Sequence, residues 1–289
     1  MTLIIQNLTK TYNNGVKAID NLNLEIGTGM FGLLGPNGAG KSSLMRTLAT
    51  LQLPDRGILT FNGIDILKDQ MSLRKILGYL PQDFGVYPNV SAEELLDYFA
   101  VLKGIVSKKE RKIIVTEVLH LTNLYEVRKK AVSGYSGGMK QRFGIAQLLL
   151  NKPKLIIVDE PTAGLDPAER NRFLNVLREI GTNNTVIFST HIVEDVKELC
   201  TELAIMNGGK ILQKTSPSAS LKNIEGKIWA IHADKNTLEG FKKTHRVLSS
   251  NYNEDHTLSI RVFAETQPNE HFHSTPPNLE DVYFIALQA

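Results

Sequence analysis

The sequence predicts an α/β fold built around a largely parallel sheet. Two continuous apolar runs, residues 154–159 and 185–189, have the composition of strands that are covered on both faces. A glycine-rich loop at 35–42 separates a third apolar run, 30–34, from a helical segment that starts near Ser43. Because strands and helices alternate along these segments, a parallel sheet with helical crossovers is the expected architecture.

The first third of the chain adds an antiparallel layer to this sheet. Residues 18–26 alternate between apolar and polar side chains, the pattern of a half-exposed antiparallel strand. Residues 57–66 have the composition of a hairpin-like pair of strands. We therefore expect antiparallel strands beside the start of the parallel core.

The middle of the chain is predicted to be helical. Ser91 with Glu94 and Ser107 with Glu110 each fit the pattern of a capping box at a helix start. Each of the two helices has an apolar face, and a third helix is expected at about 137–150. The predicted apolar faces are Leu95, Leu96, Phe99 and Leu102 in the first helix, and Ile113, Ile114, Val118 and Leu121 in the second.

The last part of the chain is predicted to return to strands and to end in a small separate domain. Asp166 begins a helix, with proline in its first turn. The composition becomes small and polar near 216–218, which indicates a boundary. Beyond it, residues 227–263 predict strand, helix, strand and strand, and Asn278 is predicted to cap a terminal helix at 279–287.

Bulk composition indicates an ordinary globular chain. Its 289 residues are 42% hydrophobic and 22% charged, enough for one large domain and one small one. A net charge of +3 is too small to indicate nucleic-acid binding. The single cysteine, Cys200, excludes an intrachain disulfide and suits a reducing compartment. The N-terminus has no secretory-signal pattern, and no apolar run approaches the ~20 residues that span a bilayer, so we expect a soluble chain.

The loop at 35–42 fits the phosphate-binding pattern G-x-x-x-x-G-K-[ST] at every fixed position, between a strand and a helix. Glycines allow successive N–H groups to point at phosphate oxygens, and the helix N-terminus adds partial positive charge. Lys41 is predicted to reach the β- and γ-phosphates, and Ser42 to give its hydroxyl to Mg²⁺. The expected ATP-binding residues of this loop are Gly35, Pro36, Asn37, Gly38, Ala39, Gly40, Lys41, Ser42 and Ser43.

Asp159 and Glu160 follow a buried apolar strand, where ligands of parallel sheets bind. Asp159 is predicted to hold Mg²⁺, directly or through water, and Glu160 to polarise the attacking water as general base. A solvated acidic turn is the alternative without a phosphate loop, and the loop disfavours it. Four histidines, His245, His256, His271 and His273, leave a metal site open, but without cysteines solvated loops are favoured.

Five further motifs lie in the order and spacing of ATP-binding-cassette (ABC) ATPases, and the resemblance covers roughly residues 1–218. The residues that resemble its motifs are Tyr12 (stacking on adenine), Gln82 (Q-loop), Ser136, Gly137 and Gly138 (signature), Asp166 (D-loop) and His191 (switch). The resemblance implies a P-loop NTPase fold, a RecA-like core with an antiparallel β subdomain and a helical subdomain at about 84–150. It also implies an ABC ATPase domain at 1–220 and an α+β accessory domain at 221–289.

The resemblance also implies a mechanism that needs two copies. ATP on the phosphate loop of one copy would be covered by Ser136 and the N–H groups of Gly137 and Gly138 in the other, with Asp166 at the seam. Gln82 would bind Mg²⁺ and sense the γ-phosphate. The implied catalytic set is Lys41, Gln82, Glu160 and His191, of which His191 contacts the γ-phosphate and helps hold the water.

The signature departs from the usual pattern at two positions. Tyr135 and Met139 stand where the family has leucine and glutamine, a variant similar to ATPase subunits of the drug-resistance and ABC-2 exporter group. This similarity implies an exporter subunit, held peripherally on the cytoplasmic face of the membrane by a separate permease that binds around 84–90. The alternatives are a soluble ABC ATPase with a non-membrane partner and an ATP-binding module that does not hydrolyse ATP.

Overall fold

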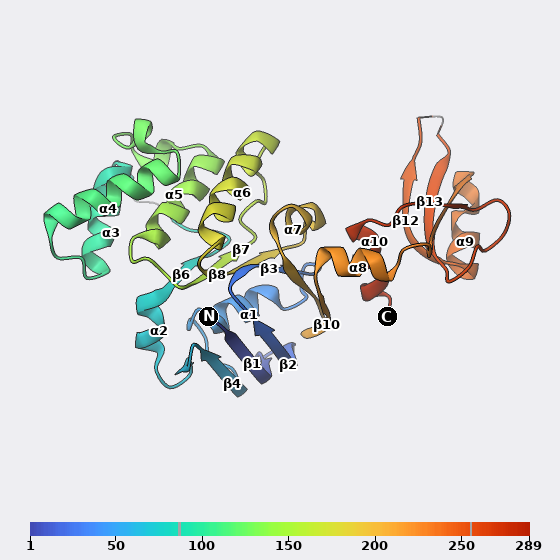
Figure 1. Ribbon diagram of the computed structural model, residues 1–289, viewed down its shortest axis with the longest axis horizontal. Coiled ribbons are helices and arrows are strands. Elements are labelled where there is room, and N and C mark those ends of the chain that lie inside the picture. The colour runs from blue at the N-terminus through green and yellow to red at the C-terminus, as the bar shows by residue number, and fades with distance from the viewer. Residues whose placement is uncertain (86–87, 255) are drawn as a thin grey trace. The chain divides into compact units, whose positions relative to one another are not determined.

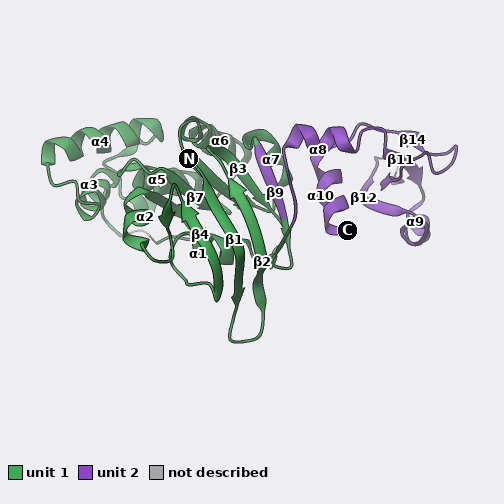
Figure 2. Ribbon diagram, turned by 60° about the horizontal axis from the view of Figure 1, so that its bottom comes forward, with its two compact units in different colours: residues 1–201, 206–211 green, residues 202–205, 212–289 purple. Residues whose placement is uncertain are grey.

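A computed structural model of the protein describes residues 1–85, 88–254 and 256–289 (Figure 1). The chain divides into two compact units (Figure 2). The first unit comprises residues 1–201 and 206–211, and the second comprises 202–205 and 212–289. The chain passes between the units within β9 (Glu202–Asn207) and β10 (Lys210–Thr215).

The expected parallel sheet is confirmed in unit 1. Four of its strands follow the order β3-β8-β7-β6 and pair in parallel. Their bounds are β3 Gly29–Leu34, β6 Leu77–Leu80, β7 Leu155–Asp159 and β8 Thr185–Thr190. The pairing places Leu34 beside Thr190, and Asp159 beside Ser189. The phosphate loop, the two carboxylates and His191 therefore all follow strand ends at one edge of the sheet.

A four-stranded antiparallel sheet with the order β2-β1-β4-β5 lies in the same unit. Its strands are β1 Leu3–Thr11, β2 Lys17–Ile26, β4 Arg56–Phe61 and β5 Ile64–Asp65. β2 and the β4–β5 pair are the strands that the sequence predicts. β1 was not predicted, although it lies between β2 and β4 and buries Leu3, Ile5 and Leu8.

Seven helices are described in unit 1: α1 Lys41–Leu48, α2 Gln70–Ile76, α3 Ala92–Leu102, α4 Lys108–Leu121, α5 Gly137–Leu149, α6 Pro167–Gly181 and α7 Val193–Leu199. α3, α4 and α5 lie together as a helical subdomain (Figure 1). The Ser91 hydroxyl accepts from the Glu94 N–H and the Glu94 carboxylate accepts from the Ser91 N–H, which confirms the first capping box. At α4, Ser107 accepts from the Glu110 N–H.

The prediction was wrong for two residues of the apolar helix faces. Leu102 is 64% exposed and Ile113 is 51% exposed, whereas their predicted companions Leu95, Ile114 and Val118 are buried. Leu102 is the last residue of α3, and Ile113 lies in the second turn of α4. The apolar pattern of the sequence therefore includes positions that no neighbouring helix covers in the described part of the chain.

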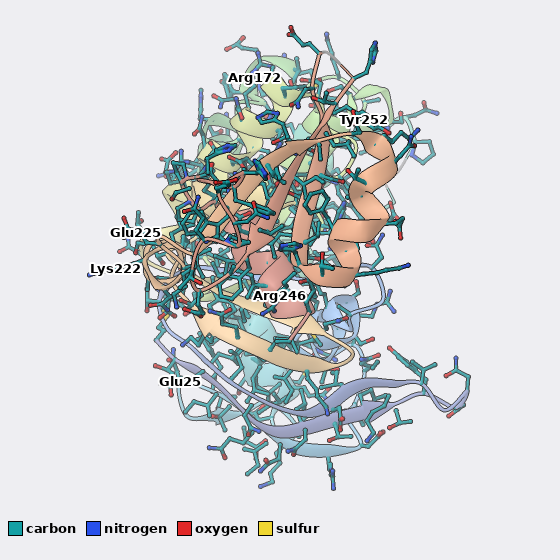
Figure 3. All side chains as sticks on the ribbon, turned by 90° about the vertical axis from the view of Figure 1, so that its right-hand side faces the viewer. Glu25, Arg172, Lys222, Glu225, Arg246 and Tyr252 are labelled. Atoms are coloured by element: carbon teal, nitrogen blue, oxygen red, sulfur yellow. The ribbon has the colours of Figure 1, made fainter. Side chains whose placement is uncertain are left out.

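Unit 2 is an α+β unit, as expected. Its antiparallel sheet has the order β12-β13-β11-β14. The strands are β11 Ile228–Ala233, β12 Arg246–Tyr252, β13 Leu258–Phe263 and β14 His273–Ser274, and the helices are α8 Pro217–Asn223, α9 Leu238–Thr244 and α10 Leu279–Leu287. The core of the sheet contains Ile231, Ile260 and Phe272. Figure 3 labels Arg246 and Tyr252, the two ends of β12.

An ion pair ties the terminal helix of unit 2 to its sheet. Arg261 on β13 donates to both carboxylate oxygens of Asp281 on α10, at 2.9 and 2.6 Å. Asp281 also completes a capping box with Asn278, the cap that the sequence predicts. Across the described parts of the chain, no helix combines the length and the apolar character that crossing a membrane requires.

Candidate active site

A pocket of about 550 Å³ surrounds the start of α1 in unit 1. Most of the residues that the sequence assigns to nucleotide binding line it. The lining consists of Tyr12, Val16, Lys17, Ala18, Pro36, Asn37, Gly38, Ala39, Gly40, Lys41, Ser42, Ser43, Gln82, Glu160, His191 and Gly208. Four of these, Val16, Lys17, Ala18 and Gly208, were not predicted. Lys17 and Ala18 begin β2, directly after the turn that follows Tyr12.

The glycines of the phosphate loop are required by its backbone. Gly38 and Gly40 have φ values of 82° and 105°, which side chains rarely allow. A Cβ at Gly40 would lie 2.1 Å from the carbonyl oxygen of Ala18, and one at Gly35 would lie 2.3 Å from that of Met206. The loop is therefore folded tightly enough for its N–H groups to approach a phosphate.

Lys41 is held at the centre of the pocket. Its side chain is 5% exposed, and its Nζ donates to the carbonyl oxygens of Gly35 at 2.7 Å and Pro36 at 3.2 Å. The same Nζ lies 3.1 Å from Glu160 Oε1, as an ion pair without a hydrogen bond. Lys41 and Glu160 therefore lie side by side in one pocket, and their catalytic roles stay a prediction.

Glu160 is fixed between a lysine and a histidine. Its φ of 47° is left-handed, a conformation that costs a non-glycine residue of order 1–3 kcal/mol and persists where the surroundings enforce it. Its N–H donates to Ser189 O at 3.0 Å, and its Oε2 lies 2.7 Å from His191 Nδ1. The carboxylate therefore faces the pocket with both oxygens engaged by cationic or ionisable groups.

Asp159 is a buried carboxylate that suits a metal ion. It is 3% exposed and accepts a hydrogen bond from the Ser189 hydroxyl. No lysine, arginine or histidine within the described ranges forms an ion pair with it. Burial, with the charge of Asp159 as a further cause, raises the pKa of Tyr79. Ser42 and Gln82 line the pocket, whereas Asp159 ends the strand that leads to Glu160. The oxygen atoms of these three side chains are of the kind that Mg²⁺ prefers, and a shared metal site stays a prediction.

Tyr12 lines the pocket through its contact with the start of α1. Its hydroxyl lies 3.0 Å from Ser43 Oγ and donates to Gln52 Oε1 at 3.1 Å. These hydrogen bonds orient the ring beside the phosphate loop. The position agrees with the prediction for Tyr12 as a nucleotide-binding residue, and stacking on adenine stays a prediction.

The predicted signature and D-loop residues do not line this pocket. Ser136 caps α5 by accepting from the Met139 N–H at 3.2 Å, and it is exposed together with Gly137. Asp166 caps α6 by accepting from the Glu169 N–H at 2.9 Å and is exposed too. Within one chain these residues are therefore separate from the site that holds Lys41 and Glu160.

Glu169 connects the signature helix to the D-loop helix, which the sequence did not predict. Its carboxylate accepts from Arg142 on α5 and from Arg172 at 2.6 Å. A Cβ at Gly138 would lie 2.2 Å from Glu169 Oε2, so Gly138 is a glycine because Glu169 packs against it. Close packing of α5 on α6 thus sets the position of Gly138.

The two unusual signature residues have different surroundings. Tyr135 is 4% exposed, and its hydroxyl donates to Val127 O at 2.9 Å. Burial raises the pKa of Tyr135 to about 12. Its extra polar atom is therefore satisfied inside the helical subdomain, whereas Met139 is half-buried at the first turn of α5.

A buried network behind the catalytic residues was also missed by sequence reasoning. Asp195 on α7 is fully buried and accepts from Thr162 Oγ1 and from Arg170 Nε, each at 2.5 Å. Thr162 follows Glu160 by two positions, and α7 follows His191. The one feature of the sequence that could have indicated this network is Asp195 itself, an acidic residue among the apolar positions of a short helix.

Known proteins resemble the chain in both sequence and fold. The ABC transporter family profile matches residues 19–163. YxlF, an uncharacterised ABC transporter ATP-binding protein of Bacillus subtilis, is 38% identical over 73% of this chain and 70% of its own length. The linearmycin resistance ATP-binding protein LnrL of the same bacterium is 37% identical over 63% of this chain, and the alignment covers only 58% of LnrL.

Further matches extend over more of the chain. Nod factor export ATP-binding protein I of Rhizobium etli is 32% identical over 98% of this chain and 92% of its own length. The dimeric structure of a bacterial ABC transporter cassette matches with a TM-score of 0.67 and 26% identity, over 74% of this chain and 98% of that one. A post-hydrolysis structure of the same cassette, bound to ADP and phosphate, matches with the same TM-score at 25% identity.

The site and these matches agree on one class of protein. The phosphate loop, Glu160 and His191 line one pocket, and the sequence and fold comparisons give one family for the segment that contains them. The chain therefore belongs to the ATP-binding proteins of the ABC transporter family, and it is an ATPase.

Proposed function

We propose that the chain is the energy-coupling subunit of an ABC exporter and works as a head-to-tail homodimer. One observation carries this proposal: Ser136, Gly137 and Asp166 are exposed and lie outside the pocket that Lys41 and Glu160 line. The nucleotide pocket of one chain contains the proposed base Glu160 but lacks the signature residues, so another chain has to supply them. A second copy of the chain supplies them, since the N-terminus of α5 offers free N–H groups for the γ-phosphate.

Lys41, Glu160 and His191 perform the chemistry in this proposal. When ATP binds, the γ-phosphate attracts the Lys41 ammonium, which in its absence lies beside Glu160. Glu160 is then free to accept a proton from the attacking water. The Glu160 carboxylate accepts a hydrogen bond from His191 Nδ1. If the ring of His191 is neutral, its Nε2 has no proton and accepts a hydrogen bond from the attacking water. If the ring is protonated, Nε2 donates a hydrogen bond to a phosphate oxygen.

Asp159, Ser42 and Gln82 would hold Mg²⁺ in this scheme. The ion would neutralise developing charge on the phosphate oxygens. Within the chain, Asp159 is oriented by the Ser189 hydroxyl on the neighbouring strand. The metal site is therefore built on two adjacent strands of the rigid sheet, with Gln82 coming from the loop after β6.

Coupling to a permease is proposed for the segment that follows Gln82. Gln82 lines the nucleotide pocket, and two residues later Phe84 packs at Gly144 on α5, where a Cβ would lie 3.0 Å from its ring. We therefore expect a movement of Gln82 on nucleotide binding to be transmitted to the helical subdomain, because Phe84 lies only two residues further along the chain. The groove predicted at 84–90 to receive a permease helix includes residues 86–87, which lie outside the described residues.

The direction of transport and the membrane location rest on similarity. An export protein aligns with nearly the whole chain, and a resistance protein aligns with its cassette, so we assign export. In this proposal the permease holds the chain on the cytoplasmic face of the membrane. We retain the division into an ATPase domain at 1–220 and an accessory domain at 221–289, the second of which serves dimer contact or regulation.

A pull-down from native membranes tests this function. The tagged chain is purified after solubilisation in a mild detergent, and the co-purifying chains are identified. A stoichiometric protein with several membrane spans is the expected result, and transport assays with that permease then give the direction. Recovery with ribosomal or DNA-associated partners alone would overturn the transporter assignment and leave the nucleotide chemistry in place.

A further inference from the structure

An apolar, basic surface lies where α3 meets α4, and the nucleotide site does not use it. We call residues 98–113 the hairpin end; it lies at the end of the helical subdomain far from β1, β2 and β4 (Figure 1). Five large apolar side chains are exposed there: Tyr98 51%, Val101 47%, Leu102 64%, Val106 86% and Ile113 51%. Large apolar side chains exposed together in so short a segment indicate an interaction site.

The same sixteen residues hold an excess of positive charge. They include five lysine or arginine residues and one glutamate, which gives +4, against +3 for the whole chain. Lys103 is turned inward, where its Nζ donates to Asn151 Oδ1 at 2.8 Å and to Leu148 O. The basic residues on the outside are Lys108, Lys109 and Lys112, which are all exposed.

Three acidic side chains near these lysines are engaged by other groups, whereas the exposed Glu110 lies among the lysines on α4. Asp97 pairs with Arg111 at 2.7 Å, and Glu93 pairs with Arg128 at 3.6 Å. Glu94 is part of the capping box of α3. Within residues 1–85, 88–254 and 256–289, no ion pair forms to Lys108, Lys109 or Lys112. Within the described residues, these three lysines thus give the hairpin end an exposed positive charge that no ion pair neutralises.

We propose that the hairpin end contacts a lipid surface that carries anionic headgroups. Aliphatic side chains enter the boundary between headgroups and acyl chains, while the surrounding lysines bind the anionic groups. Val106 is the most exposed of the large apolar residues in the described chain, so its side chain is available to enter a lipid surface.

A neighbouring cleft shares Lys108 and Lys112 with the hairpin end. It is lined by Ser91, Glu93, Glu94, Asp97, Lys108, Lys112, Val115 and Lys129, and none of the five exposed apolar residues is among them. The exposed apolar side chains therefore lie outside this cleft. The inference rests on the proposed function only in that a permease would bring the chain to the membrane.

Vesicle flotation of the full chain tests the inference without a permease. We compare vesicles of phosphatidylcholine alone with vesicles of equal parts phosphatidylglycerol and phosphatidylcholine. Binding to the second kind, weakened by salt, is the expected result. A triple change of Lys108, Lys109 and Lys112 to Gln is expected to lower affinity about fivefold per lysine, or about a hundredfold in total.

A second triple change supplies the matched control. Lys222, Lys235 and Lys243 are exposed lysines of unit 2, and Figure 3 labels Lys222 at its surface. Changing all three to Gln alters the net charge equally and is expected to leave vesicle binding within about twofold, since screening confines such forces to about 10 Å. Equal losses in the two triple variants would show diffuse charge attraction and would overturn the proposal, as would no binding by the unchanged chain.

A fluorescent label then places the contact. An environment-sensitive dye is attached at Val106→Cys, with Tyr252→Cys as the exposed control in unit 2. Cys200 is buried, and burial raises the pKa of its thiol, so it does not compete for the label. A blue shift on anionic vesicles at residue 106 alone is expected. A blue shift of the dye that requires the permease and not the lipid would show that the hairpin end binds a protein instead of a lipid surface. Capture of a permease without vesicle binding would contradict this inference and leave the proposed function intact.

Discussion

The Lys41 ammonium lies 3.1 Å from the Glu160 carboxylate, and the two side chains are 5% and 8% exposed. In this arrangement the lysine that should bind phosphate neutralises the carboxylate that should act as base. Removing one member of a buried ion pair leaves an unpaired charge and costs about 3–5 kcal/mol. In the function we propose, ATP binding replaces Glu160 by a phosphate as the partner of Lys41, and this exchange releases the base only when the phosphate is present.

Changing Glu160 to Gln is expected to abolish ATP hydrolysis while ATP binding persists. The amide keeps the size of the side chain but cannot accept the proton of the attacking water, which typically costs 10²–10⁴-fold in turnover. The variant should also form an ATP-dependent dimer, because the closed state is no longer released by hydrolysis. Phosphate release and size-exclusion chromatography with ATP check the two outcomes.

Glu179→Gln is the matched control for this change, since Glu179 is exposed on α6. It should retain turnover within about twofold, as expected for a surface change far from special contacts. Persistent turnover in Glu160→Gln would show that another group is the base.

Changing Lys41 to Ala is expected to weaken nucleotide binding and to destabilise the chain without nucleotide. The second effect follows because Glu160 would be left buried without a cation, at about 3–5 kcal/mol. Adding Glu160→Gln should recover most of that loss, so the two changes are non-additive. Urea denaturation of the four proteins measures the coupling, and nucleotide titration measures binding. Additive losses of stability would contradict the ion pair.

Local sequence patterns place several predicted site residues close together because these residues follow strand ends. The phosphate loop, Asp159 and His191 all come after apolar runs, and parallel pairing brings such ends to one edge. β1 escaped prediction because its alternation is broken by register shifts between Ile5 and Leu8. Its place between β2 and β4 depends on non-local pairing.

Contacts between helices are what the sequence leaves undetermined. The apolar periodicity includes Leu102 and Ile113, yet only packing against neighbouring helices decides where burial stops. In the same way, a pattern does not show that Thr162 and Arg170 converge on Asp195, or that Glu169 touches Gly138. Thr162 and Arg170 lie 33 and 25 residues from Asp195 in the sequence. Arg142, the other partner of Glu169 on α5, lies 27 residues from it.

Changing Glu169 to Ala is expected to lower both stability and dimer formation. Arg142 has a side chain that is 6% exposed and would be left without its carboxylate, at about 3–5 kcal/mol. The signature at Gly138 would also lose the side chain that packs on it. Urea denaturation gives the stability, and ATP-dependent dimerisation in the Glu160→Gln background gives the second readout.

Arg172→Ala is the control for that change, because Arg172 is the other partner of Glu169 but has a side chain that is 60% exposed; Figure 3 labels it. Its loss should cost no more than about 1 kcal/mol, as for a surface ion pair. Equal effects of the two changes would mean that the Arg142 contact does not position the signature.

Changing Lys103 to Met is expected to remove a pH dependence of stability. Burial lowers the pKa of Lys103 from 10.5 to about 8 in the folded chain. Between these values the unfolded lysine still holds its proton while the folded one has lost it, so this group makes stability rise with pH in that window.

Below pH 8 both states of Lys103 are charged, and the folded state bears the burial of the charge. Lys103→Met removes the cost of burying this charge and also removes two hydrogen bonds worth about 1 kcal/mol each. The net effect expected at pH 7 is a gain in stability of about 1 kcal/mol. Urea denaturation at pH 7 and pH 10 measures both effects. Because other groups titrate in the same range, the exposed Lys130→Met serves as reference. Equal slopes in the two variants would show that Lys103 keeps its proton in the folded chain.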